Sequence, residues 1–173
     1  MIEITQQPPL LWTPVHVRPR CEKVTAQYCK GIGLHHYLPL IRRAARYQRR
    51  TVETFIPMFP GYLFVQLGPE ETEALVRCNK IATILRLTPA QENQLVSELR
   101  SLQVLEANNK DAELIVSPEL VPGTAVEVID GPFRGMVGVV VKRAKSTRLS
   151  VNVEMLGQSV SVDLDVGEVA EAV

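Results

Sequence analysis

Positive charge is concentrated in one stretch of this chain, from Leu40 to Val52, which contains five arginines and no acid. These are Arg42, Arg43, Arg46, Arg49 and Arg50. A guanidinium group donates paired hydrogen bonds to phosphate oxygens, and a dense group of such side chains attracts polyanions. A solvated loop or hairpin that binds nothing would also tolerate these residues, since few apolar positions lie between them. We expect the stretch to contact phosphate groups.

A second basic group lies where the first predicted strand ends. The alternation from Trp12 to Val17 predicts a strand, and a helix is expected from Glu22 to Lys30. The connection and the first helical turn carry Arg18, Arg20 and Lys23. Residues 1–69 contain nine Lys and Arg against three Asp and Glu, whereas residues 70–173 contain ten against sixteen. The net charge of zero therefore conceals a basic first third, which we expect to face a polyanion.

Residue types used in catalysis and metal binding form no recognisable arrangement. The candidate ligands of the first half are His16, His35, His36, Cys21 and Cys29. Their spacing matches no standard metal site. No nucleophile motif, phosphate-binding loop or carboxylate pair is present, and the first third has few acids for general acid–base catalysis. We therefore expect neither an enzyme nor a bound metal or cofactor.

The cysteine content and the length of the apolar runs indicate the cellular compartment in which the protein is expected. The chain has three cysteines and no C-x-x-C motif, which is typical of a reducing compartment. No apolar run approaches the roughly 18 to 20 residues that span a bilayer, and the N-terminus lacks the features of a signal peptide. We expect a cytoplasmic protein with no membrane contact.

The segment from Met58 to Leu67, M-F-P-G-Y-L-F-V-Q-L, predicts a bend followed by a strand. Leu63, Val65 and Leu67 fall on one face of this strand and form part of the core. Tyr62 and Phe64 fall on the other face. That face is either covered by a helix or forms a surface that receives a partner.

The remaining pattern divides the chain into two domains. Strand and helix signals alternate up to a helix expected from Pro89 to Glu106, which predicts an α/β sandwich over residues 10–106. Residues 107–117 are polar and turn-prone and predict a flexible linker, of which only Leu114 to Val116 could dock transiently. Residues 118–173 contain fourteen valines and five short strand patterns. The fold class is therefore α+β, an α/β domain followed by a small five-stranded SH3-like β-barrel.

Two motifs resemble the NusG family of transcription factors. F-P-G-Y-L-F-V, from Phe59 to Val65, resembles the N-terminal NGN domain of that family. G-T-A-V-E-V-I-D-G-P-F-R-G-M-V-G-V-V, from Gly123 to Val140, resembles a KOW domain, in which Gly138 would let one strand lie close to its neighbour. Lys145 to Asp165 resembles the rest of the barrel. The likeness runs from Trp12 onward.

This resemblance implies an elongation factor that binds RNA polymerase, holds the polymerase clamp closed over nucleic acid and suppresses pausing. The matching polymerase contacts are Phe59, Tyr62, Phe64 and Ile84. Arg18, Arg20 and Lys23 match the basic corner that approaches the non-template DNA strand. Arginines there could hold phosphate or read a flipped base.

For the barrel, the resemblance implies recruitment of a ribosomal small-subunit protein or of the termination factor Rho. The matching residues are Phe133, Met136 and Leu156. Leu156 occupies a place where general NusG proteins usually have an aromatic residue, which argues against Rho. The sequence R-P-R-C-E-K and the arginine-rich stretch resemble specialised paralogues such as RfaH-like and capsule-operon antiterminators. We expect a monomeric, operon-specific antiterminator.

The main alternative is a KOW-containing ribosomal or RNA-binding structural protein. It requires a basic barrel, because RNA binding depends on neutralising phosphates. Residues 118–173 contain five Lys and Arg against eight Asp and Glu. This balance favours the elongation factor.

Overall fold

A computed structural model describes residues 2–47, 50–108, 113–117, 122–142, 147–164 and 169–171. The chain forms two compact units, Met1–Val96 and Ser97–Val173, which are considered separately below. Helix α3 (Pro89–Asn108) begins in the first unit and ends in the second. No helix in the described ranges is long and apolar enough to cross a membrane.

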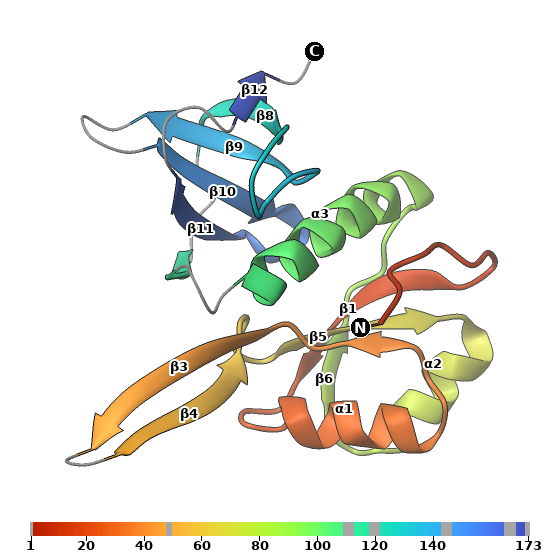
Figure 1. Ribbon diagram of the computed structural model, residues 1–173. Coiled ribbons are helices and arrows are strands. Elements are labelled where there is room, and N and C mark those ends of the chain that lie inside the picture. Colours follow the sequence, from red (N-terminus) through yellow and green to blue (C-terminus); the bar gives the residue numbers. More distant parts are fainter. Residues whose placement is uncertain are drawn as a thin grey trace. The chain divides into compact units, whose positions relative to one another are not determined.

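The first unit is built on an antiparallel sheet with the strand order β2-β5-β1-β6 (Figure 1). Its strands are β1 (Leu11–Val17), β2 (His36–Tyr37), β5 (Tyr62–Leu67) and β6 (Ile81–Ile84). Its other helices are α1 (Glu22–Gly31) and α2 (Pro69–Val76). The strands and helix expected around Trp12, Tyr62 and Glu22 are confirmed.

Both α2 and α3 begin with capping interactions that are local in sequence. The Glu71 carboxylate accepts a hydrogen bond from the backbone N–H of Gly68, at 3.1 Å, and Pro69 occupies the first turn of α2. At α3, the backbone N–H of Thr88 donates to Gln91 Oε1 at 2.9 Å. These bonds satisfy backbone donors that a helix leaves without internal partners.

The core of the first unit lies on the aliphatic face of β5. Leu63, Val65 and Leu67 pack there with Val15, Val17, Cys29 and Leu75. The core therefore joins β5 to β1, α1 and α2. The prediction for this face is confirmed.

The arginine-rich stretch forms a separate two-stranded sheet. Strands β3 (Leu40–Tyr47) and β4 (Arg50–Pro57) pair in antiparallel register, from Leu40 opposite Pro57 to Tyr47 opposite Arg50. Figure 1 shows the hairpin extending from the first unit. Of the two structures that the sequence allowed, the hairpin is the one formed.

The second unit contains one antiparallel sheet with the strand order β12-β8-β9-β10-β11-β7. The strands are β7 (Ile115–Ser117), β8 (Thr124–Val128), β9 (Val137–Lys142), β10 (Thr147–Val153), β11 (Gln158–Leu164) and β12 (Val169–Glu171). A 3₁₀ turn, η1 (Glu154–Leu156), joins β10 to β11. The α+β fold class is confirmed.

The expected extent of the linker requires a correction at its C-terminal end. Ile115–Ser117 pairs with Ser161, Val160 and Ser159 of β11, and Leu114 is 2% exposed. The described part of the sheet therefore has six strands rather than the expected five. Burial of Leu114 and pairing with β11 stabilise a segment that looks too polar to fold. Residues 109–112 lie outside the described ranges.

Gly138 on β9 is the position at which close packing of strands tolerates no side chain. A Cβ atom there would lie 2.5 Å from the carbonyl oxygen of Ser150 on β10. We expect Gly138→Ala to lower the free energy of unfolding by about 1–3 kcal/mol, because the backbone of β9 must move away from β10. Urea unfolding followed by circular dichroism measures this change.

Gly31→Ala is the matched control, because a Cβ atom at Gly31 meets nothing within 4 Å. Its stability should change by less than about 1 kcal/mol. Equal stabilities of the two variants would show that the close approach of β9 and β10 does not exclude a side chain at Gly138.

Candidate functional site

The aromatic residues predicted to bind a partner lie along one face of β5. Phe59 contacts Phe64 edge to face, with ring centroids 6.3 Å apart. Tyr62 stacks against His16 of β1 with a centroid separation of 4.8 Å and an interplanar angle of 32°. Strand alternation puts Tyr62 and Phe64 on the same face, with Gln66 beyond them. The aromatic residues therefore form two ring pairs on this face, Phe59 with Phe64 and Tyr62 with His16. We call this set the aromatic row.

This aromatic face is largely covered in the structure. Phe64 is 0% exposed and Phe59 is 1% exposed, whereas Tyr62 is half-buried. The side chain of Gln66 donates to the carbonyl of Thr5 at 2.7 Å, so the N-terminal segment crosses one end of the face. The face is therefore covered in this conformation, because burial stabilises an apolar face. Its role in binding a partner stays a prediction.

Helix α3 also contributes to the cover within the first unit. Glu92 on its first turn accepts a hydrogen bond from the backbone N–H of Trp12 at 3.1 Å and one from Gln6 Nε2 at 2.8 Å. The indole N–H of Trp12 donates to the carbonyl of Thr5 at 2.9 Å. Glu92 is 3% exposed, so its carboxylate is buried with these partners. The start of α3 is thereby tied to β1.

The structure does not bring Ile84 together with the aromatic row. Ile84 pairs with Val15, and its half-buried side chain packs against the aliphatic core. Tyr62 pairs instead with His16, on the opposite face of the sheet. Ile84 belongs to the core side because its register on β6 places it there.

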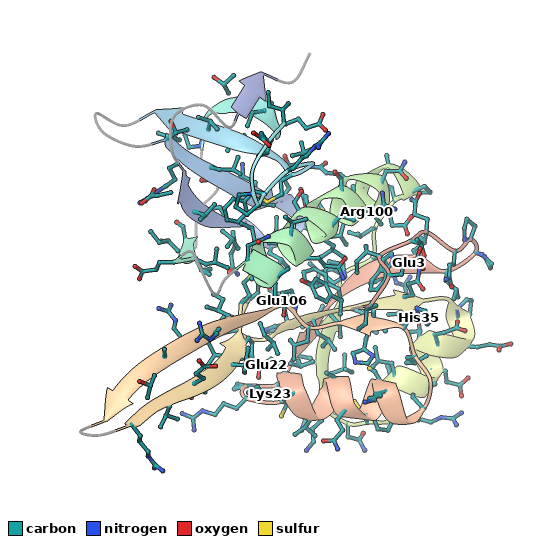
Figure 2. All side chains as sticks on the ribbon, viewed as in Figure 1. Glu3, Glu22, Lys23, His35, Arg100 and Glu106 are labelled. Carbon is teal, nitrogen blue, oxygen red and sulfur yellow. The ribbon has the colours of Figure 1, made fainter. Side chains whose placement is uncertain are left out.

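The basic corner is exposed and lies beside the base of the hairpin. Arg18 and Arg20 occupy the turn between β1 and α1, and both side chains are exposed. Lys23 on the first turn of α1 donates from Nζ to the carbonyl of Phe55 on β4, at 2.5 Å. Figure 2 shows Lys23 beside Glu22 at the start of α1. The structure thus joins two basic groups that are separate in the sequence.

Glu22 is an acid in the middle of this basic corner. It is 7% exposed, and its Oε1 accepts a hydrogen bond of 2.7 Å from the backbone N–H of Gly61 in the F-P-G-Y bend. The carbonyl of Gly61 in turn accepts from the backbone N–H of Val17. Gly61 has φ +86°, and a Cβ atom there would meet the His16 ring at 3.1 Å. Glu22 therefore fixes the bend against α1.

The hairpin arginines differ in their surroundings. Arg42 forms an ion pair with Glu53 of β4 and is partly buried. Arg43 and Arg50 are exposed, and neither forms an ion pair with any residue that the structure describes. Arg49 and the side chain of Arg46 fall outside the part of the chain that the structure describes.

The three candidate partner residues of the second unit are not freely exposed. Phe133 is 4% exposed, Met136 is 0% exposed, and Leu156 is half-buried. Their role as a docking surface stays a prediction. Residues of α3 in this unit form hydrogen bonds to the backbone beside them.

Three polar residues of α3 hold the backbone next to these candidates. Ser101 Oγ lies 3.3 Å from both the backbone nitrogen and the carbonyl oxygen of Val137. Asn108 Nδ2 donates to the carbonyl of Pro132 at 2.8 Å, and Glu98 Oε1 accepts from the backbone N–H of Glu154 at 3.4 Å. At about 100° per residue, the three positions fall within roughly 80° of the helix circumference. One face of α3 therefore lies against the loops that carry the candidates.

No metal site emerges from the described residues, in which no group of three or more His, Cys, Asp or Glu is placed to hold an ion. Cys29 is fully buried, and burial, together with the neighbouring Cys78, raises the pKa of the Cys29 thiol from 9.0 to about 12. Cys29 therefore stays protonated and packs as a small apolar residue.

These features define a protein of two units, an α/β unit with a basic hairpin and a predominantly β unit, whose surfaces suit macromolecular partners. Residues 10–106 match the sequence profile of the family described as "Transcription termination factor nusG". The match covers more than half of the chain, which therefore belongs to the NusG family. It is a transcription factor of the termination and antitermination class.

Two similar proteins illustrate the relationship. The "Transcription termination/antitermination protein NusG" of Deinococcus radiodurans is 28% identical over 129 residues, which are 66% of this chain and 68% of that protein. The structure titled "Domain interaction in Thermotoga maritima NusG" aligns over 95% of this chain and 98% of its own, with a TM-score of 0.50 and 19% identity. The second likeness supports the fold.

Several residues that organise these surfaces were not identified from the sequence. Glu22 could have been noticed because it is the single acid among the residues of the basic corner. Glu92 could have been noticed as an acid in the first turn of a helix. Ser101 and Asn108 carry no comparable signal, because isolated polar residues on a helix are usually solvated.

The Glu22 bond to Gly61 predicts a defined loss of stability. We expect Glu22→Ala to lower the free energy of unfolding by about 1.5–3 kcal/mol, because a backbone donor loses a charged acceptor. Glu22→Gln keeps an acceptor oxygen and should lose less. Glu73→Ala is the control, since Glu73 forms only an exposed ion pair with Arg77, expected to contribute about 0.5 kcal/mol. Equal effects of the two alanine variants in urea unfolding would contradict this role of Glu22.

The Ser101 contact predicts a local change in hydrogen exchange. Ser101→Ala leaves the backbone N–H of Val137 without its hydroxyl partner, at a cost of about 1–2 kcal/mol. We expect exchange of the Val137 amide to become about tenfold faster. Ser97→Ala, at an exposed serine of the same helix, should leave it unchanged. Unchanged exchange in Ser101→Ala would show that α3 does not protect this strand.

Proposed function

We propose that this protein binds RNA polymerase through the aromatic face of its first unit and promotes processive, pause-resistant transcription. The observation that carries the proposal is membership of the NusG family over residues 10–106, with F-P-G-Y at the head of the central strand. Aromatic side chains bury a large area for few rotatable bonds and are typical interface anchors. The proposed clamp contacts are Tyr62, Phe59 and Phe64.

The burial of these residues sets a condition for binding. Tyr62 is half-buried and can contact a partner first, whereas Phe59 and Phe64 contribute only when the segments that cover them move. The hydrogen bonds from Gln66 and Trp12 to Thr5, and from Trp12 to Glu92, identify part of that cover. Any cost of opening lowers the apparent affinity for the polymerase.

The basic corner supports a contact with the non-template DNA strand. Arg18, Arg20 and Lys23 are exposed, and Lys23 connects this corner to the hairpin. A polymerase-bound factor with such a surface would act on the DNA strand that transcription leaves unpaired. The concentration of arginines on the hairpin is the feature that favours a specialised, operon-specific antiterminator, acting in the cytoplasm.

The second unit is proposed to recruit a ribosomal small-subunit protein through Phe133, Met136 and Leu156. In this conformation Glu98, Ser101 and Asn108 of α3 hold the loops that carry these residues. Recruitment therefore requires α3 to leave this face. The absence of an aromatic side chain at Leu156 argues against Rho as the partner.

A transcription assay with purified components tests the polymerase role. We expect the wild-type protein to increase read-through of a terminator and to shorten pauses on a template from its own gene neighbourhood. Tyr62→Ala should weaken polymerase binding by about tenfold or more, because a central aromatic contact is worth roughly 2 kcal/mol. Binding is measured with labelled protein and core polymerase.

Tyr28→Ala is the matched control for this assay. Tyr28 is also half-buried, but it lies on α1, where its hydroxyl donates to the carbonyl of Ala74. It should keep wild-type affinity for polymerase when folded. Equal affinities of wild type and Tyr62→Ala, or no effect of the wild type on read-through, would refute the proposal.

A further inference from the structure

The register of the hairpin separates its charged residues onto two different faces. In antiparallel strands, residues directly opposite each other share a face, and successive residues alternate between faces. Arg42 lies opposite Phe55, and Ala44 lies opposite Glu53. These residues therefore share one face, to which the register also assigns Arg46, opposite Thr51. We call this the mixed face.

Arg43 lies opposite Thr54, and Tyr47 lies opposite Arg50. Arg43 and Arg50 consequently share the other face, which we call the cationic face. The hairpin sequence from Leu40 to Pro57 contains a single acid, Glu53, and it belongs to the mixed face. The two faces thus differ in net charge although their arginines are adjacent in sequence.

The ion pairs sharpen this difference. On the mixed face, Arg42 is bonded to Glu53, and its side chain is 25% exposed. On the cationic face, Arg43 and Arg50 are exposed and form no ion pair with a described residue. A paired arginine contributes little to attracting a polyanion, whereas an exposed and unneutralised one contributes fully.

The spacing of the two arginines suits an extended chain of phosphates. Arg50 lies opposite Tyr47, which follows Arg43 by four positions on β3. This offset corresponds to about 14 Å along the strand. At roughly 3.4 Å per nucleotide in a stacked strand, this distance spans about four phosphates. Each guanidinium group can hold a separate phosphate without competing with the other.

We propose that the hairpin binds the sugar-phosphate backbone of nucleic acid through the cationic face. Arg43 and Arg50 make phosphate contacts, and the paired Arg42 and Glu53 make none. The inference deepens the nucleic-acid contact of the proposed function by assigning it to one face. It does not depend on polymerase binding.

The test uses the purified full chain without polymerase and fluorescein-labelled 20-nucleotide oligo(dT). Binding is measured by anisotropy over a range of salt concentrations. We expect Arg43→Gln with Arg50→Gln to reduce the slope of log K against log salt by about 1.4 in magnitude, because each lost phosphate contact removes about 0.7 for a single strand. Affinity at low salt should fall at least tenfold.

The matched control removes the pair on the other face. Arg42→Gln with Glu53→Gln leaves the net charge unchanged, and we expect its slope and affinity to stay within twofold of the wild type. Arg46 and Arg49 remain in every variant. A 20-base-pair duplex tested in parallel distinguishes single-stranded from double-stranded DNA as the preferred form. Thermal melting by circular dichroism verifies that each variant is folded.

Three results would overturn the inference: an unchanged slope in the Arg43 and Arg50 variant, equal losses in both double variants, or no binding by the wild type. Because the assay contains no polymerase, failure here leaves the polymerase proposal standing. Conversely, loss of polymerase binding in Tyr62→Ala does not affect this result. The two proposals can therefore fail independently.

Discussion

The first unit depends on strand β5 being covered on both faces. Its aliphatic side chains pack on the core shared with α1 and α2, and Phe64 on the other face is equally buried. A strand buried on both faces fixes register strongly, because a shift of one residue would exchange the two sets of side chains. This constraint positions the F-P-G-Y bend, which Glu22 then holds through the backbone of Gly61. The basic corner at the start of α1 is thereby placed beside the hairpin.

Helix α3 forms hydrogen bonds within both units, and it uses a different part of its length for each. Glu92 bonds to the N-terminal part of the first unit, whereas Glu98, Ser101 and Asn108 bond to loops of the second. At about 100° per residue, Glu92 lies roughly 120° around the helix axis from Glu98. The hydrogen-bonding residues of α3 therefore lie on more than one side of the helix, whereas the fully buried Leu95, Leu99 and Leu102 recur on one face. Phe59, Phe64, Phe133 and Met136 are buried, so the proposed protein contacts of these residues require them to be uncovered.

Local rules predicted most of the elements, but not which surfaces are covered. Pro69 and Thr88 mark helix starts through capping chemistry that acts within a few residues, and both helices begin there. The burial of Phe64 and Met136 depends on segments distant in sequence, which periodicity cannot identify. Ile84 illustrates the same limit, because its face follows from its register with Val15 and not from its own residue type. The strand at Ile115–Ser117 forms because β11 offers an edge to pair with.

The hairpin places neighbouring like charges on a sheet of two strands. An isolated pair of strands is marginally stable in water, and neighbouring like charges lower that stability further. The base is anchored by the burial of Ile41 and by the bond from Lys23 to the Phe55 carbonyl. The ion pair between Arg42 and Glu53 relieves repulsion on one face, while no acid of the hairpin does so for Arg43 and Arg50. A bound polyanion would supply the missing neutralisation, so the uncompensated charge that disfavours the free hairpin favours the bound one.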